Sequence, residues 1–139
     1  LSDPFLALNP PKSLDKGYFS LAWLAQHLTP TDAPQDVQAT LVAFTAHCVQ
    51  RALTMHSVKQ LGVCGGGCHN EALMHQLTRC LPGVSVVSTA QLGAPPDYLE
   101  AMMIACLASK TLAGEALSLE AVTGGQKTLL GCIFPATQA

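Results

Sequence analysis

Charge is scarce in this 139-residue chain. Asp, Glu, Lys and Arg make up 12% of the residues, about half of the roughly 25% that is usual for a soluble domain. Aromatic residues are also few, at 5%, whereas apolar residues account for 49%. Because so few charged side chains are available to cover the apolar surface, we expect something other than solvent to cover part of it.

Clustered positive charge and long apolar runs are missing as well. The seven Lys and Arg residues are scattered and the net charge is −2, so we expect neither nucleic acid nor an anionic membrane as a partner. No apolar run reaches the about 18 residues of a transmembrane helix, and residues 1–20 lack the basic and apolar regions of a signal peptide. These features predict a cytoplasmic protein.

The length is that of a single domain with one core. The first residue is Leu1 rather than Met, and the opening residues read like the continuation of a longer chain. A piece of a larger protein and a processed or trimmed chain are both compatible with these two facts.

The six cysteines do not have the pattern of a disulfide or zinc framework. Most stand inside apolar helical or strand-like runs, which predicts buried thiols rather than the loop-rich scaffold of a small secreted protein. Cys64, Cys68 and His69 have ligand chemistry suited to zinc. Three glycines fill the gap between the two cysteines, however, and no second closely spaced pair completes a site. We therefore predict no metal site.

Periodicity and turn residues predict alternating helices and strands. Helices are expected over 20–28, 37–55, 70–81 and 97–112, and strands over 61–64, 84–88 and 129–134. Met102, Met103 and Cys106 are expected on the buried face of the last helix. This order predicts an α/β fold with mostly parallel strands. We expect a single partial domain over 1–139, with a leading loop and short helix over 1–35 and an α/β lobe over 36–139.

The most informative segment is residues 61–70, an apolar strand followed by three glycines and a helix that Asn70 can cap. Glycines at a strand-to-helix turn let the backbone approach a ligand closely, and the N–H groups at a helix start favour anions. The segment lacks the Lys of a P-loop and the third Gly of a dinucleotide motif. Taken alone, it fits a nucleotide cradle and a tight structural turn equally well.

This segment resembles the adenosine-binding motif of the actin-like sugar-kinase superfamily, which has a ribonuclease H-like fold. More narrowly, the chain resembles the C-terminal part of the anhydro-N-acetylmuramic acid kinases. The matching strings occur in the family's order and span nearly the whole chain; they are residues 1–5, 11–13, 18–19, 36–41, 63–70, 100–101, 122–124, 130–131 and 133–136.

The resemblance implies an ATP- and Mg²⁺-dependent kinase of peptidoglycan recycling and amino-sugar metabolism. Such an enzyme cleaves the 1,6-anhydro ring of its sugar with water while phosphorylating O6. The family carries its phosphate-binding Gly-Thr-Ser loop and its catalytic Asp, in an Asp-Thr-Gly-Pro-Gly string, in the N-terminal part. Neither string occurs here, so the general base is expected outside this chain, and we expect the chain alone to be inactive.

Residue by residue, the resemblance assigns Gly65, Gly66 and Gly67 to the adenosine and α-phosphate side of ATP. Asn70 would cap the following helix and contact the nucleotide. Glu100 matches a Glu that faces the sugar cleft, although a solvated carboxylate is the competing interpretation. Apart from the resemblance, His69 is expected on a helix surface and Asp97 at a helix N-cap.

A second function class is left open. The fold can serve as a non-catalytic interaction or dimerisation module that uses an exposed apolar face to bind a partner. The resemblance itself also implies homodimers. Nucleotide binding would favour the kinase lobe, whereas concentration-dependent association without nucleotide binding would favour the interaction module.

Overall fold

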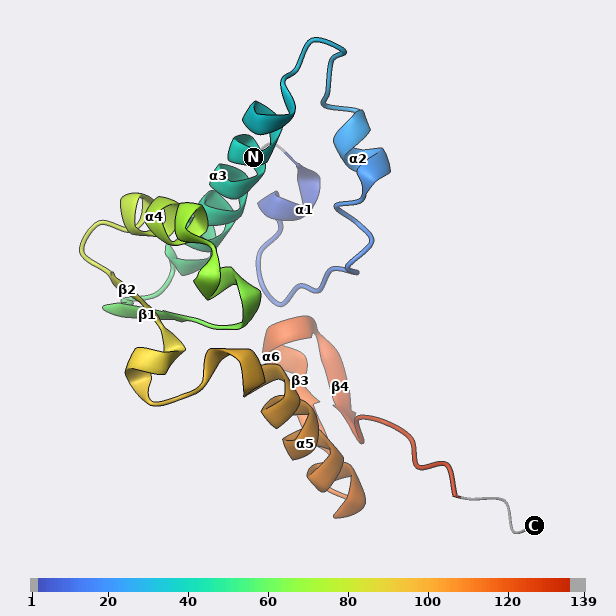
Figure 1. The fold of residues 1–139 in the computed structure, drawn as a ribbon. Coiled ribbons are helices and arrows are strands. Elements are labelled where there is room, and N and C mark those ends of the chain that lie inside the picture. The colour runs from blue at the N-terminus through green and yellow to red at the C-terminus, as the bar shows by residue number, and fades with distance from the viewer. Residues whose placement is uncertain (1–2, 136–139) are drawn as a thin grey trace. The chain divides into compact units, whose positions relative to one another are not determined.

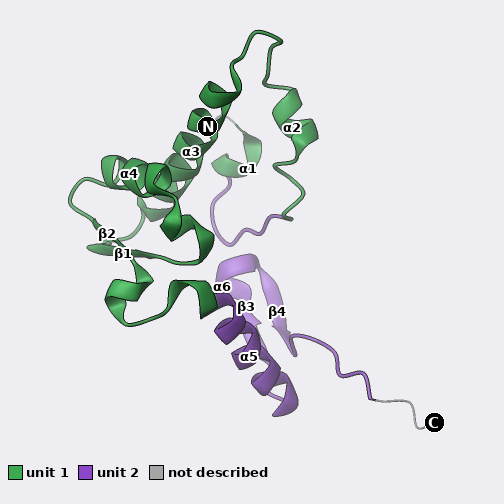
Figure 2. Cartoon of the chain, in the orientation of Figure 1, with its two compact units in different colours: residues 1–7, 15–99 green, residues 8–14, 100–139 purple. Residues whose placement is uncertain are grey.

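The computed structural model describes residues 3–135. The chain divides into two compact units (Figure 2). Unit 1 comprises residues 1–7 and 15–99, and unit 2 comprises residues 8–14 and 100–139. Helices and short strands alternate along the chain (Figure 1), which confirms a mixed α/β architecture.

Unit 1 begins with helices whose ends follow from local sequence. α1 covers Pro4–Ala7 and α2 covers Leu21–Ala25, where the Ser20 hydroxyl accepts a hydrogen bond from the backbone N–H of Trp23. α3 covers Pro34–Leu53 with a proline in its first turn, a position at which the missing N–H costs nothing. Both predicted helices in this region are therefore confirmed, with α2 shorter than expected.

The rest of unit 1 is built on a strand–helix–strand segment. β1 (Gln60–Val63) leads through a 3₁₀ turn, η1 (Gly65–His69), into α4 (Glu71–Cys80), and the chain returns in β2 (Ser85–Ser88). The two strands pair in parallel, with Gln60 opposite Ser85 and Val63 opposite Ser88. This confirms the parallel pairing expected from the sequence.

The core of unit 1 lies where α3 and α4 pack side by side over β1 and β2 (Figure 1). Ala46 is fully buried, and Leu77 and Cys80 are nearly so. The helix predicted over 37–55 runs past the observed end of α3 at Leu53, and Met55 is 85% exposed. Ala46 and Val49 of α3 face the core.

Unit 2 contains α5 (Leu99–Leu112), β3 (Leu117–Leu119), α6 (Glu120–Thr123) and β4 (Gly125–Thr128). Leu99, the first residue of α5, is assigned to unit 1, and the rest of the helix to unit 2. β3 and β4 pair antiparallel. The prediction of mostly parallel strands therefore does not extend to this unit, because a four-residue helix is too short for a crossover between parallel strands.

The strand predicted over 129–134 is also wrong. Gly131 has a φ of +114°, outside the extended region of a strand. Ile133 and Phe134 are 62% and 89% exposed, so this end of the apolar run is not buried as a core strand would be.

Several side chains expected in the core are exposed. Met102, Met103 and Cys106 on α5 all lie open to solvent, and only Leu99 and Leu107 among the apolar residues of this helix are partly covered. The expectation of buried cysteines also fails for Cys64, Cys106 and Cys132, whereas Cys80 is buried. Within residues 3–135, no helix combines the length and apolar character needed to cross a bilayer.

Candidate functional site

The carboxyl ends of the two parallel strands lie at one edge of unit 1. β1 ends at Val63 and enters the glycine turn, and β2 ends at Ser88 and enters η2 (Thr89–Leu92). The two exits lie close together, since a Cβ on Gly62 would come within 3.2 Å of the Thr89 methyl group. This edge is where open α/β sheets bind ligands.

Each of the three glycines of the turn has a different environment. Gly65 has a φ of +64°, a conformation that glycine adopts without steric cost. A Cβ on Gly67 would make ordinary contacts with Leu73 and Val63, at 3.6 and 3.7 Å. Gly66 has neither constraint: its φ is not positive, and a Cβ there would meet nothing within 4 Å.

Asn70 joins the glycine turn to α4. Its backbone N–H donates to the carbonyl oxygen of Gly67 over 3.2 Å, and its side-chain amide oxygen accepts from the backbone N–H of Leu73 over 3.0 Å. Asn70 is therefore the N-cap of α4, as the sequence predicted. Gly65–Gly67 and Asn70 thus lie within one short turn, in which Gly66 and Asn70 are exposed.

A contact that the sequence did not predict joins this turn to the segment after β2. His69 Nε2 lies 2.7 Å from Asp97 Oδ1. His69 ends η1, and Asp97 lies within η3 (Pro96–Tyr98) rather than at a helix N-cap. The two residues are 28 positions apart in the sequence, and nothing local predicts this pairing.

The electrostatics of the turn are mixed. Glu71 stands in the first turn of α4 and Asp97 beside His69, so two carboxylates lie near the glycines. Thr89 Oγ1 is buried and has no hydrogen-bond partner among the described residues. Open space at Gly66 suits an uncharged ring or sugar approaching the backbone, whereas the carboxylates disfavour a polyphosphate at the same point.

Glu100, the predicted substrate-side residue, belongs to unit 2. It lies exposed in the first turn of α5, where a carboxylate also favours the helix through its dipole. Among residues 3–135, no three His, Cys, Asp or Glu side chains gather closely enough to hold a metal ion.

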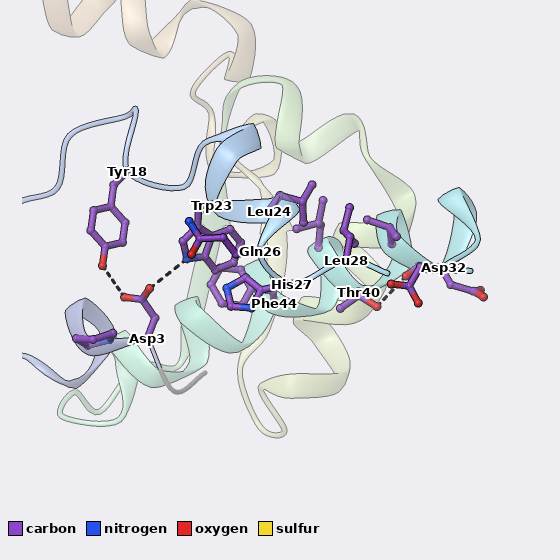
Figure 3. Close-up of a pocket in the computed structure, with 14 residues that line it drawn as sticks. Asp3, Tyr18, Trp23, Leu24, Gln26, His27, Leu28, Asp32, Thr40 and Phe44 are labelled. Atoms are coloured by element: carbon purple, nitrogen blue, oxygen red, sulfur yellow. Dashed lines mark hydrogen bonds between the residues drawn. The ribbon is translucent and has the colours of Figure 1, made fainter. Parts of the chain in front are cut away.

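Unit 1 also contains a pocket of about 750 Å³ that the sequence reasoning missed (Figure 3). It lies beside α2 and the first half of α3 and combines aromatic rings with carboxylates. Prominent lining residues are Asp3, Tyr18, Trp23, Asp32, Asp36 and Phe44. One signal was available in the sequence, because five of the seven aromatic residues fall within residues 5–44.

Asp3 organises one wall of this pocket. Its carboxylate accepts hydrogen bonds from the Tyr18 hydroxyl over 3.1 Å and from Trp23 Nε1 over 3.3 Å (Figure 3). The pKa of Tyr18 is raised above its ordinary value by desolvation, and further by the hydrogen bond to Asp3 and the negative charge of that carboxylate. Ring contacts continue from Trp23 to Phe19 and Phe44, with centroids 5.0 and 5.8 Å away.

Comparison with known proteins extends over almost the whole chain. Residues 1–136 match the family model for anhydro-N-acetylmuramic acid kinase. The chain is 49% identical over 138 residues to the anhydro-N-acetylmuramic acid kinase of Legionella pneumophila (strain Corby), covering 97% of this chain and 38% of that protein. It is 49% identical over 140 residues to the enzyme of that name from Xanthomonas campestris pv. campestris (strain 8004), covering 98% and 37%. For the Pseudomonas syringae pv. tomato protein of that name, identity is 46% over 141 residues, covering 98% and 39%.

Proposed function

Since the chain belongs to the anhydro-N-acetylmuramic acid kinase family, we propose that it is the ATP-binding C-terminal lobe of such a kinase, with an actin-like fold. The complete enzyme would open the 1,6-anhydro ring of anhydro-N-acetylmuramic acid and phosphorylate O6 in the recycling of peptidoglycan in the cytoplasm. The chain spans 38% of the length of the Legionella relative, so the remaining lobe would come from sequence outside it.

The environment of Gly66 is the observation that carries this proposal. A tight turn accounts for Gly65, whose positive φ requires glycine, but the backbone and packing at Gly66 do not require it. A glycine that the fold does not need, placed exposed at the carboxyl edge of parallel strands, is explained by a ligand that must approach the backbone closely.

The charges around the turn support a position for the adenosine part of ATP rather than its γ-phosphate. Gly65–Gly67 would bring the backbone close to the adenosine and α-phosphate, and Asn70 would add a side-chain amide. ATP supplies the phosphoryl group, and Mg²⁺ neutralises phosphate charge. With Glu71 and Asp97 beside the turn, the terminal phosphates and the ion would lie away from it, toward the part of the enzyme outside this chain.

The general base that activates water would also come from outside the chain. None of the nine acidic residues stands in the Asp-Thr-Gly-Pro-Gly string that the family resemblance calls for. Glu100 would contribute a carboxylate on the sugar side, where it can accept hydrogen bonds from substrate hydroxyls. We therefore expect nucleotide binding without turnover from the isolated chain.

Calorimetric titration of the purified chain with Mg·ATP tests this function. We expect saturable binding that Gly66→Val weakens at least tenfold without lowering the unfolding midpoint. Equal affinity of the variant would show that the glycine serves only as a turn. ATP-dependent phosphorylation of the anhydro sugar by the chain alone would overturn the assignment of the base to a separate lobe.

The exposed apolar residues of α5 favour a second candidate, a dimerisation module. Met102, Met103 and Ile104 are 53%, 54% and 60% exposed, and such a patch suits an interface. Sedimentation across a concentration series distinguishes the two candidates: self-association without Mg·ATP binding would favour the module. Homodimers that also bind nucleotide would be compatible with the kinase.

A further inference from the structure

The hydrogen bond between His69 and Asp97 joins the glycine turn to η3, a segment of unit 1 that is distant in the sequence. His69 is the last residue of η1, and its Nε2 donates to Asp97 Oδ1 over 2.7 Å. Asp97 lies in η3, which packs against η1. The contact therefore joins the exit of β1 to the segment that follows β2.

Global stability does not account for this pair. The two side chains are 60% and 59% exposed, and exposed pairs of this kind contribute little to the free energy of folding. Asn70 fixes the turn on the side of α4, through its N–H bond to the Gly67 carbonyl and its side-chain cap. The side of the turn that carries Gly66 is exposed to solvent. Its conformation therefore depends on the contact made at the C-terminal end of η1, where His69 lies.

We propose that Asp97 is a positioning residue for nucleotide binding, acting through His69 to hold the glycine turn in its binding conformation. This inference rests on the function proposed above. A turn that is already ordered loses less conformational entropy when the nucleotide binds, and affinity rises accordingly.

Mg·ATP affinities of paired variants test the proposal. We expect Asp97→Ala and His69→Ala each to weaken binding about threefold to fivefold, and the double variant to be no weaker than either, because both remove the same contact. His69→Gln places an amide donor near the position of Nε2 and should stay within about twofold of the parent. Additive losses, or no loss, would overturn the proposal.

Asp32→Ala is the matched control for charge. Asp32 is an exposed carboxylate of unit 1 that accepts from the backbone N–H of Thr29, away from the glycine turn in sequence. Its removal changes the net charge as Asp97→Ala does, so we expect unchanged Mg·ATP affinity. A loss equal to that of Asp97→Ala would indicate a general effect of charge. It would overturn the proposed role of the His69–Asp97 hydrogen bond as the tether of the glycine turn.

Hydrogen exchange without nucleotide separates failure of the tether from failure of ATP binding. We expect Asp97→Ala to speed amide exchange at Gly66–Asn70 by about threefold to fivefold while the amides of α4 around Leu77 stay unchanged. Unchanged exchange in the turn would overturn the tether even if the chain binds ATP. If the parent chain binds no Mg·ATP, the proposed function fails, while faster exchange would still support the tether itself.

Discussion

Asn70 holds the N-terminus of α4 through its side chain, whose amide oxygen accepts a hydrogen bond from the Leu73 backbone N–H over 3.0 Å. The same residue binds the carbonyl of Gly67 through its own N–H. One residue thus links the start of a core helix, through its side chain, to the turn that we assign to the nucleotide, through its backbone N–H. Its structural role and its proposed ligand role are separable by substitution.

Replacing Asn70 with Ala removes the cap and should lower the free energy of unfolding by about 1 kcal/mol. Asn70→Asp keeps a good capping acceptor, so its stability should match the parent in urea denaturation. The added negative charge should nevertheless weaken Mg·ATP binding in calorimetry. An Asp variant with parental affinity would mean that Asn70 is a cap alone.

The glycines of the turn should separate into two classes. Gly65→Ala forces a Cβ into a left-handed conformation and should cost roughly 1–2 kcal/mol of stability. Gly83→Ala, at a φ of +82° outside the turn, is the matched control and should cost a similar amount while leaving Mg·ATP affinity unchanged.

Gly66→Ala belongs to the other class. Its Cβ meets no heavy atom within 4 Å, so thermal unfolding should show equal or slightly higher stability, because Ala restricts the unfolded chain. Nucleotide affinity should fall nonetheless. Destabilisation comparable to that of Gly65→Ala would show that the fold itself requires this glycine.

Truncation of a core side chain and of an exposed apolar side chain should lower the free energy of unfolding by very different amounts. Leu77 is 3% exposed and packs among Ala46 and Cys80, so Leu77→Ala should lower the free energy of unfolding by about 2–5 kcal/mol. Met102 is 53% exposed, and Met102→Ala should stay within about 0.5 kcal/mol of the parent. Urea titrations of the two variants check both values; a large loss for Met102→Ala would mean that α5 is covered in solution.

The pocket wall around Tyr18 should give a pH-dependent signal. The pKa of Tyr18 is raised above 10.0 by desolvation and by Asp3, so the folded state favours the protonated phenol. The contribution of the protonated Tyr18 phenol to the free energy of unfolding is fully present below about pH 10. It is lost as the pH rises through the raised pKa of Tyr18.

Ultraviolet titration of Asp3→Asn in a Tyr98→Phe background, where only Tyr18 titrates, should show a lower pKa than the same background with Asp3 intact. The fall should be partial, because desolvation, the larger cause, remains. An unchanged pKa would show that the carboxylate does not act on the phenol.

Local signals in the sequence were sufficient for the elements that surround the candidate site. The glycine triplet, the capping Asn70 and the spacing of Leu73 and Leu77 predicted the β1–η1–α4 segment. They succeeded because turn conformation, capping and helix amphipathicity depend on residues within a few positions of each other. The family strings identified the kinase resemblance for a similar reason, since each is a short local pattern.

Contacts between distant residues needed the tertiary structure. The pairing of His69 with Asp97 joins residues whose separation in sequence carries no signal. The aromatic residues clustered within 5–44 are visible in the sequence, but their contacts with Asp3 are not. The exposure of Met102 was equally hidden, because helical spacing shows which side chains share a face and not what covers that face. The sequence by itself therefore determined the family, the glycine turn and its cap. Only the tertiary structure decided which groups brace that turn and which apolar faces stay open, because both depend on packing between elements.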